Sequence, residues 1–249
     1  MCGRFVITSP PDAMRRLLRY REQPNFPARY NVAPTQPIPV VRLINGARTF
    51  TLMRWGLLPG WVKEPKGFTL LINARAETAA EKPAFRNALK RRRCLLPADG
   101  FYEWKREGAL KQPYFIRRRD RAPFAFAGLW ETWSGPGGEE IDTAAIVTTD
   151  ASADIAGLHH RMPVTIDPDD FDAWLDDTSD AGVVQRLMRP AREGQFELFP
   201  VSDRVNKVIN DDPRNVEPVV ARTIPEKPEP KPDRKSDTPR PDDGQMSLF

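Results

Sequence analysis

The sequence predicts an α+β fold whose mainly antiparallel sheets form a barrel-like or two-sheet core, with a few helices around it. Three observations support this prediction. Many short strand-like runs are bounded by turn signals, only a few segments show helical spacing, and no internal repeat is present. The chain has 249 residues, of which 40% are hydrophobic, so it can build a sizeable core in one large domain or two small ones.

The N-terminal region begins with a predicted helix over Pro10–Tyr20. Proline stands at its start, Asp12 lies in the first turn, and Met14 and Leu17 recur at helical spacing. A proline-rich passage, Pro24–Pro39, follows. Because proline donates no backbone hydrogen bond, we expect this passage to be an extended loop and not a central strand.

Short strands dominate the middle of the chain. Asn45-Gly46 stands between two apolar runs, which indicates a tight hairpin. The expected strands are Val40–Leu43, Thr49–Trp55, Leu70–Asn73, Cys94–Glu103, Pro113–Arg117, Phe124–Trp130, Ile141–Thr148 and Val164–Ile166. Further helices are expected over Ala84–Lys90, Pro168–Leu175 and Gly182–Met188.

The composition changes at about Pro225 and divides the chain into a folded domain, residues 1–224, and a tail, residues 225–249. The segment Pro225–Gly244 is rich in proline and charged residues and has almost nothing to bury, so we expect it to be disordered. The last five residues, Gln245–Phe249, end in apolar side chains.

Charge and cysteine content restrict the function classes. The net charge is +4, and arginines crowd residues 86–93 and 117–119, which suits a polyanion such as nucleic acid or forms a solvated charged face. Two cysteines make no disulfide framework, and neither a membrane span nor a secretory signal is present, so a cytoplasmic location is expected. No metal-ligand spacing and no nucleotide-binding glycine loop occur, so we expect no metal and no cofactor.

Cys2 directly follows the initiator methionine. Removal of Met1 would leave an α-amine, with a pKa of about 7.7–8.0, and a thiol, with a pKa of about 8.5, on one residue. An amine adds to an aldehyde to give a Schiff base, and the thiol can close onto that imine as a five-membered thiazolidine. The alternative is that a small residue follows Met1 only for translation or processing.

Three polar residues are candidate partners for Cys2. Asn73 ends an apolar run and either caps a turn or faces a site. Glu103 lies among aromatic residues and is either a surface carboxylate or an inward acid whose pKa burial would raise. His159 and His160 are the two histidines of the chain, and either one is a candidate proton shuttle or a satisfied polar group.

Six segments together resemble the SRAP family, the abasic-site processing proteins. They occur in family order and cover the chain from Met1 to about Ile224. The segments are Met1–Phe5, Arg29–Pro34, Trp55–Pro59, Asn73–Thr78, Asp99–Trp104 and His159–Pro163.

The resemblance implies a protein that binds single-stranded DNA and shields abasic sites during the DNA damage response. Cys2 would be the nucleophile that forms a thiazolidine with the ring-opened sugar. Asn73 would hydrogen-bond the sugar-derived part, Glu103 would assist proton transfer at the amine, and His159 would act as acid and base. His159 is preferred over His160 because the family histidine stands two residues before the arginine. The family is also described as removing its own first residue.

DNA contacts are expected from Arg4, Arg75 and Arg161 to phosphates and from Trp61 to a base. Relatives often carry a second aromatic residue after that tryptophan, and Val62 stands there in this chain.

Two other functions are compatible with the same residues. They are a cysteine peptidase that acts in trans through Cys2 and His159, and a non-covalent single-stranded DNA-binding module. The ending Gln245–Phe249 resembles peptides that dock on the bacterial sliding clamp, with the preceding segment as a tether. We expect a monomer that is associated with the nucleoid.

Overall fold

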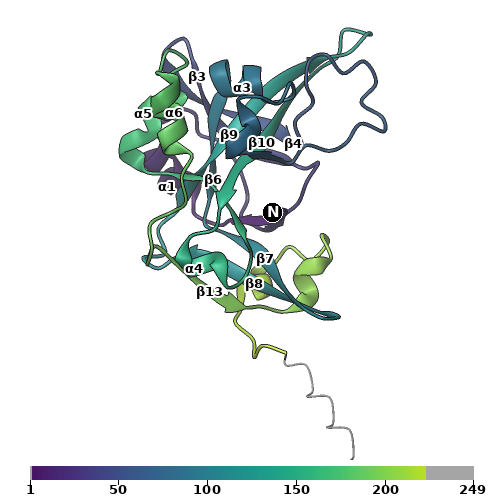
Figure 1. Ribbon diagram of the computed structural model, residues 1–249, viewed down its shortest axis with the longest axis vertical. Coiled ribbons are helices and arrows are strands. Elements are labelled where there is room, and N and C mark those ends of the chain that lie inside the picture. The colour runs from purple at the N-terminus through teal and green to yellow at the C-terminus, as the bar shows by residue number, and fades with distance from the viewer. Residues whose placement is uncertain (1, 223–249) are drawn as a thin grey trace, which may run out of the picture.

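The computed structural model describes residues 2–222 and confirms the α+β class (Figure 1). The tail predictions for Pro225–Gly244 and Gln245–Phe249 concern residues outside this range. Two sheets form the body: a five-stranded sheet in the order β13-β8-β7-β1-β2, and an eight-stranded sheet in which β11-β10-β4-β3-β6-β9-β12 are neighbours and β5 pairs with β10.

The elements of the five-stranded sheet are β1 (Phe5–Ile7), β2 (Arg29–Val32), β7 (Gly100–Glu107), β8 (Leu110–Arg118) and β13 (Phe196–Pro200). The eight-stranded sheet contains β3 (Pro37–Ile44), β4 (Ala47–Trp55), β5 (Asn73–Arg75), β6 (Arg93–Ala98), β9 (Phe124–Ser134), β10 (Glu140–Asp150), β11 (Arg161–Pro163) and β12 (Thr165–Ile166). The α-helices are α1 (Pro11–Leu18), α2 (Ala76–Ala79), α3 (Arg86–Arg91), α4 (Ala153–Ala156), α5 (Phe171–Leu175) and α6 (Ala181–Leu187). Short 3-10 turns cover Pro168–Asp170, Asp203–Asn206 and Pro213–Val216.

The predicted hairpin at Asn45-Gly46 is confirmed. Ile44 pairs with Ala47, and both turn residues have positive φ, 51° at Asn45 and 75° at Gly46. This is the backbone that a two-residue hairpin with right-handed twist requires.

The prediction that Pro24–Pro39 is wholly a loop is wrong in two places, because β2 occupies Arg29–Val32 in its middle and β3 begins at Pro37 near its end. Strand β3 lies between β4 and β6. Both of its prolines precede Val41, the residue at which β3 pairs with Leu95 of β6. The prolines therefore lie in a part of β3 that does not pair with β6, so their missing N–H groups interrupt no hydrogen bonds between these two strands.

The predicted single strand Cys94–Glu103 is also wrong, since the chain changes sheets at Asp99. Strand β6 pairs with β9, whereas β7 pairs with β8 and β1. The Asp99 carboxylate holds this corner by accepting hydrogen bonds from the backbone N–H groups of Thr8 and Ser9 at 2.5 and 2.8 Å. Gly100 follows because a Cβ there would lie 2.4 Å from the ring of Phe115.

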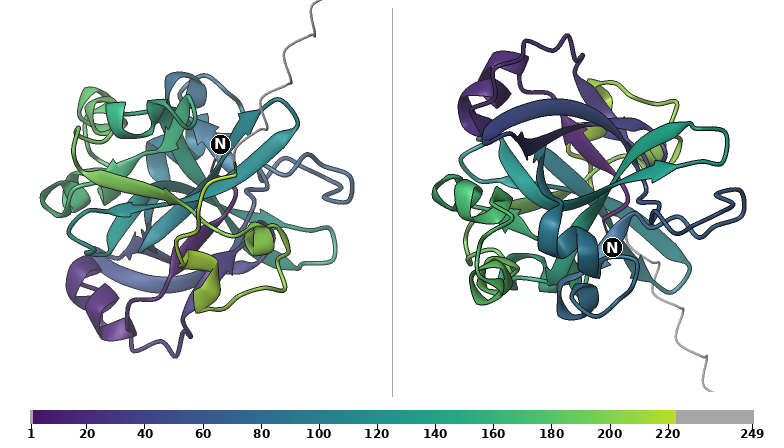
Figure 2. Two further views of the ribbon diagram at one scale, coloured as in Figure 1. Left: turned by 90° about the horizontal axis from the view of Figure 1, so that it is seen from below. Right: turned by 90° about the horizontal axis from the view of Figure 1, so that it is seen from above.

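The core joins the two sheets through aromatic side chains of both. Phe5 of β1 is fully buried and packs edge-on against Trp55 of β4, with ring centroids 5.1 Å apart, and against Phe126 of β9 at 5.8 Å. Phe101 of β7 packs against the same Phe126 at 5.9 Å. The N-terminal end consequently lies between the small and the large sheet (Figure 1), while the loop after β4 extends away from the body (Figure 2).

We predict that Phe5→Ala lowers the free energy of unfolding by about 3–5 kcal/mol, because it leaves a cavity where the two sheets meet. Denaturant unfolding measures this loss. Leu52→Ala is the control, since Leu52 is 52% exposed and its truncation should change stability by less than about 0.5 kcal/mol. Equal effects of the two substitutions would contradict the anchoring role of Phe5.

Candidate functional site

Four segments that are distant in sequence carry the predicted site residues. Cys2 precedes β1, Asn73 begins β5, Glu103 lies within β7, and His159 lies between α4 and β11. The side-chain amide of Asn73 donates a hydrogen bond to the backbone carbonyl of Cys2 at 2.9 Å. The charge of Glu103 acts on both the Cys2 thiol and the His159 ring. The structure therefore brings the four residues together.

Cys2 is fully buried, and its Sγ lies 3.8 Å from the carbonyl oxygen of Arg4, to which the thiol donates. Burial raises the pKa of the Cys2 thiol well above its ordinary value, and the nearby Glu103 carboxylate raises that pKa further. The thiol is therefore protonated at neutral pH.

Asn73 is held in place by the parallel pairing of β5 with β10. Asn73 lies opposite Ile146, and the N–H of Ile146 donates to the carbonyl of Ile72 at 3.0 Å. The amide nitrogen of Asn73 contacts Cys2, whereas its Oδ1 is buried and has no hydrogen-bond partner within residues 2–222. Because a buried acceptor without a partner is costly, this oxygen is suited to a ligand that donates a hydrogen bond.

Glu103 is not a surface residue, since only 3% of it is exposed. Alternation along β7 puts it on the face that carries the fully buried Phe101, whereas Tyr102 and Trp104 point to the other face and pack with a second cluster. A carboxylate on this inner face is suited to exchange protons with groups of the site and not with bulk water.

His159 is half-buried, and its neighbour His160 is exposed and stacks on it with ring centroids 4.5 Å apart. Nδ1 of His159 lies 2.9 Å from the backbone nitrogen of Arg161 and 3.1 Å from the Arg161 carbonyl oxygen, so the Arg161 backbone fixes the position of this ring nitrogen. Burial lowers the pKa of His159, although the Glu103 charge acts in the opposite direction. The ring is thus mainly neutral at pH 7.

The residues predicted to contact DNA divide into two groups, those with exposed side chains and those whose side chains are bonded within the protein. Trp61 is 60% exposed and packs edge-on against Phe68, and Arg75 is exposed at the end of β5. Arg4 instead donates to Oδ1 of Asn31 at 2.9 Å and to the carbonyl of Val205 at 2.7 Å.

Arg161 belongs to the second group. It is 7% exposed and forms ion pairs with Glu77 and Asp150, both at 2.8 Å. Its guanidinium, like that of Arg4, is therefore occupied by acceptors of the protein.

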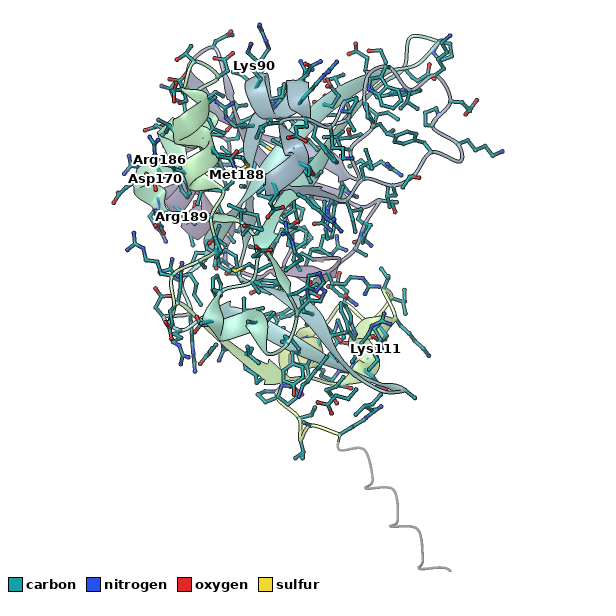
Figure 3. All side chains as sticks on the ribbon, viewed as in Figure 1. Lys90, Lys111, Asp170, Arg186, Met188 and Arg189 are labelled. Carbon is teal, nitrogen blue, oxygen red and sulfur yellow. The ribbon has the colours of Figure 1, made fainter. Side chains whose placement is uncertain are left out.

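The two arginine-rich stretches are also partly structural. Arg93 is 3% exposed and donates to the carbonyl of Trp174 at 2.6 Å, and Arg117 pairs with Glu197 at 2.7 Å. Lys90 of α3 remains exposed, and with Met188 it lines a cavity of about 500 Å³ between α3 and the region of α6. Both residues are labelled in Figure 3. None of the predicted site residues lines this cavity.

Two structurally important residues were not among the predicted site residues. Asn31 is fully buried, and its side-chain amide nitrogen lies within hydrogen-bond distance, 2.8–3.2 Å, of the carbonyl oxygens of Val205, Lys207 and Asn210, which holds the segment 205–210 against β2. Glu77 pairs with Arg161. Both lie in segments that carry the family resemblance, which was the only signal that could have identified them.

Within residues 2–222, no group of three or more histidine, cysteine, aspartate or glutamate side chains is placed to hold a metal ion. The helices of the same range are all too short or too polar to cross a membrane.

Comparison with known proteins identifies the family. The family model described as SOS response associated peptidase (SRAP) matches residues 1–208. The abasic site processing protein YoqW of Bacillus subtilis (strain 168) is 38% identical over 224 residues, which cover 87% of this chain and 99% of that protein. The abasic site processing protein HMCES of Gallus gallus is 33% identical over 267 residues, covering 88% of this chain and 78% of that protein.

A crystal structure of a protein from Bacteroides thetaiotaomicron superposes with a TM-score of 0.77 and 27% sequence identity, covering 87% of this chain and 100% of that one. The resemblance seen in the six sequence segments is thereby confirmed. The chain belongs to the SRAP family.

Proposed function

We propose that this protein processes abasic sites by binding single-stranded DNA and linking Cys2 covalently to the ring-opened abasic sugar. Family membership and the names of its relatives support the general role in DNA damage. The observation that carries the specific chemistry is the 2.9 Å hydrogen bond from Asn73 to the Cys2 carbonyl, beside the buried Glu103 and the half-buried His159.

The reaction begins with loss of Met1, which converts the nitrogen of Cys2 from an amide into an amine. That amine attacks the C1 aldehyde of the opened sugar, and loss of water leaves a C=N bond. The sulfur of Cys2 then adds to the same carbon while the thiol proton passes to the nitrogen, which closes the thiazolidine. The protonated state of the buried thiol favours this order, with the amine first and sulfur second.

Each neighbouring group has a role that its position supports. Glu103 accepts a proton from the attacking amine and returns it to the departing water. Asn73 fixes the backbone of Cys2, and its Oδ1 accepts a hydrogen bond from a sugar hydroxyl. His159 donates a ring proton to the ring oxygen of the closed sugar while the C1 hydroxyl gives up its proton to water, which breaks the bond between C1 and the ring oxygen and releases the aldehyde.

Arg75 and Trp61, which present exposed side chains, hold the DNA strand. Val62, where relatives often carry an aromatic residue, is buried and its carbonyl accepts from the indole N–H of Trp133. Base stacking in this loop therefore depends on Trp61 and on Phe68 beside it, at 5.9 Å between ring centroids.

A peptidase that acts in trans requires a thiolate at neutral pH, and the raised pKa of the Cys2 thiol opposes it. Self-removal of Met1 belongs to the proposal. Docking of Gln245–Phe249 on a sliding clamp, the monomeric state and the nucleoid location stay predictions.

We predict a crosslinked band when the purified protein is mixed with single-stranded DNA that contains one abasic site and resolved on a denaturing gel. Cys2→Ala should abolish the stable band. Cys2→Ser keeps the amine and should give a product only when borohydride reduces the Schiff base. Cys94→Ala is the matched control, because Cys94 is the other buried cysteine and lies inside β6, where it has no free α-amine. A stable band from Cys2→Ala, or none from the wild type, would refute the proposal; a non-covalent binding module would give no band at all.

Asn73→Ala should slow crosslinking by about tenfold, since it removes one hydrogen bond to the residue that reacts, worth about 1.4 kcal/mol. Binding to intact single-stranded DNA should change by less than about twofold, as measured by fluorescence anisotropy. Asn87→Ala, at an exposed position of α3, should leave both quantities unchanged. Weaker DNA binding with an unchanged crosslinking rate would show instead that Asn73 contacts the DNA strand.

His159 makes stability depend on pH. Its pKa is lowered in the folded chain from the unfolded value of about 6.5, so between the two values only the unfolded chain binds the proton. The free energy of unfolding therefore decreases as the pH falls from about 6.5 towards the folded pKa. Urea titrations at pH 7.5 and 5.5 should show a smaller decrease in His159→Gln than in His160→Gln, and equal decreases would contradict the burial of His159.

A further inference from the structure

His160 lies beside His159, between α4 and β11, and it is exposed whereas His159 is half-buried. The two rings stack with their centroids 4.5 Å apart and an angle of 20° between their planes. The stack covers one face of the His159 ring, so a reacting group must approach that ring at an edge or at its other face. The proposed mechanism uses His159 and leaves His160 without a role.

The backbone of both histidines is held by hydrogen bonds. The N–H of His159 donates to the carbonyl of Ile155 in α4 at 3.1 Å, and the carbonyl of His160 accepts from the N–H of Ala151 at 3.0 Å. These bonds close the loop that joins β10 to β11. Neighbouring side chains of an extended strand point to opposite sides, so the two rings can stack only because the backbone bends at His160 before β11 begins.

Two contacts restrict the orientation of the His159 ring. Nδ1 lies between the backbone nitrogen of Arg161, at 2.9 Å, and the carbonyl oxygen of the same residue, at 3.1 Å, which places one atom of the ring. One placed atom leaves the plane of the ring undetermined, because the terminal torsion of a histidine side chain is broad. The stacked ring of His160 supplies the second restriction and sets this plane.

The same stack restricts the charge of the two rings. Burial lowers the pKa of His159, the Glu103 carboxylate of β7 raises it, the amino terminus lowers it, the backbone of Arg161 raises it, and the His160 ring lowers it. Asp150, on the neighbouring β10, pairs instead with the guanidinium of Arg161. Two positive rings at this separation repel each other, so protonation of one opposes protonation of the other.

We propose that His160 is a positioning residue for His159: its stacked ring sets the plane in which His159 exchanges protons with the sugar, and it limits the two rings to one positive charge. This inference rests on the proposed function. A His159 ring that turned freely would present its nitrogens to the sugar only part of the time and would react more slowly. A lowered pKa also makes protonated His159 a stronger acid towards the ring oxygen of the sugar.

The first test compares crosslinking rates at saturating abasic single-stranded DNA. His160→Ala removes the ring and should slow crosslinking by about tenfold, since a small misplacement of a reacting group costs up to about a hundredfold. His160→Phe keeps a ring that can stack and should restore the rate to within about twofold of the wild type. Gln185→Ala, at an exposed position of α6, is the control and should react at the wild-type rate. His160→Ser decides by the same criteria if His160→Ala does not fold.

The second test needs no DNA. The sequence has two histidines, so His160→Phe leaves His159 as the single histidine in an NMR titration of the full chain. The pH midpoint of His159 should be higher in His160→Phe than in the wild type, because no second positive ring then opposes its protonation. His160→Ala removes the same charge and should shift the midpoint in the same direction.

Slow crosslinking by His160→Ala, a restored rate in His160→Phe and a raised midpoint of His159 would together support the proposal. It is overturned by a wild-type rate in His160→Ala, by a rate in His160→Phe as low as that of His160→Ala, or by an unchanged midpoint. A wild-type chain that fails to crosslink would refute the proposed function, whereas the titration would still decide whether the two rings are coupled.

Discussion

The burial of Phe5 between the two sheets is the constraint on which the site depends. Its ring is fully buried and packs against Trp55 of the large sheet, while its backbone pairs with Phe101 and Val32 in the small sheet. Cys2 stands three residues earlier, so it cannot move more than about 10 Å from this anchor. An N-terminal residue, which is usually the most mobile part of a chain, is thereby held against Asn73.

Burial also determines the protonation states at the site. It raises the pKa of the Cys2 thiol and lowers that of the His159 ring, so both groups are neutral at pH 7. Neutral groups suit the proton transfers of the proposed mechanism, in which the amine attacks first. The same neutrality opposes the thiolate and imidazolium pair of a cysteine peptidase.

The arginines show why composition is a weak guide to nucleic-acid contact. Arg4, Arg93 and Arg161 each donate to carbonyls or carboxylates inside the protein, and their positive charge serves the packing of loops and strands. Arg75 differs because it ends β5 with its side chain in solvent. The count of basic residues is the same in both cases, and only the acceptors around each guanidinium distinguish an arginine that is bonded within the protein from one that is exposed.

Local sequence signals determined the fold class, the Asn45-Gly46 hairpin and the segments that identify the family, because turn chemistry, hydrophobic spacing and contiguous motifs are properties of short stretches. They also located Asn73, Glu103 and His159 as residues of one site through the resemblance to the family. Only the tertiary structure decided that Cys94–Glu103 is divided between two sheets, that β3 tolerates Pro39 inside a sheet, and that Arg161 pairs with Glu77. These features depend on which strand lies beside which, and pairing between residues far apart in the chain leaves no periodic trace in either partner.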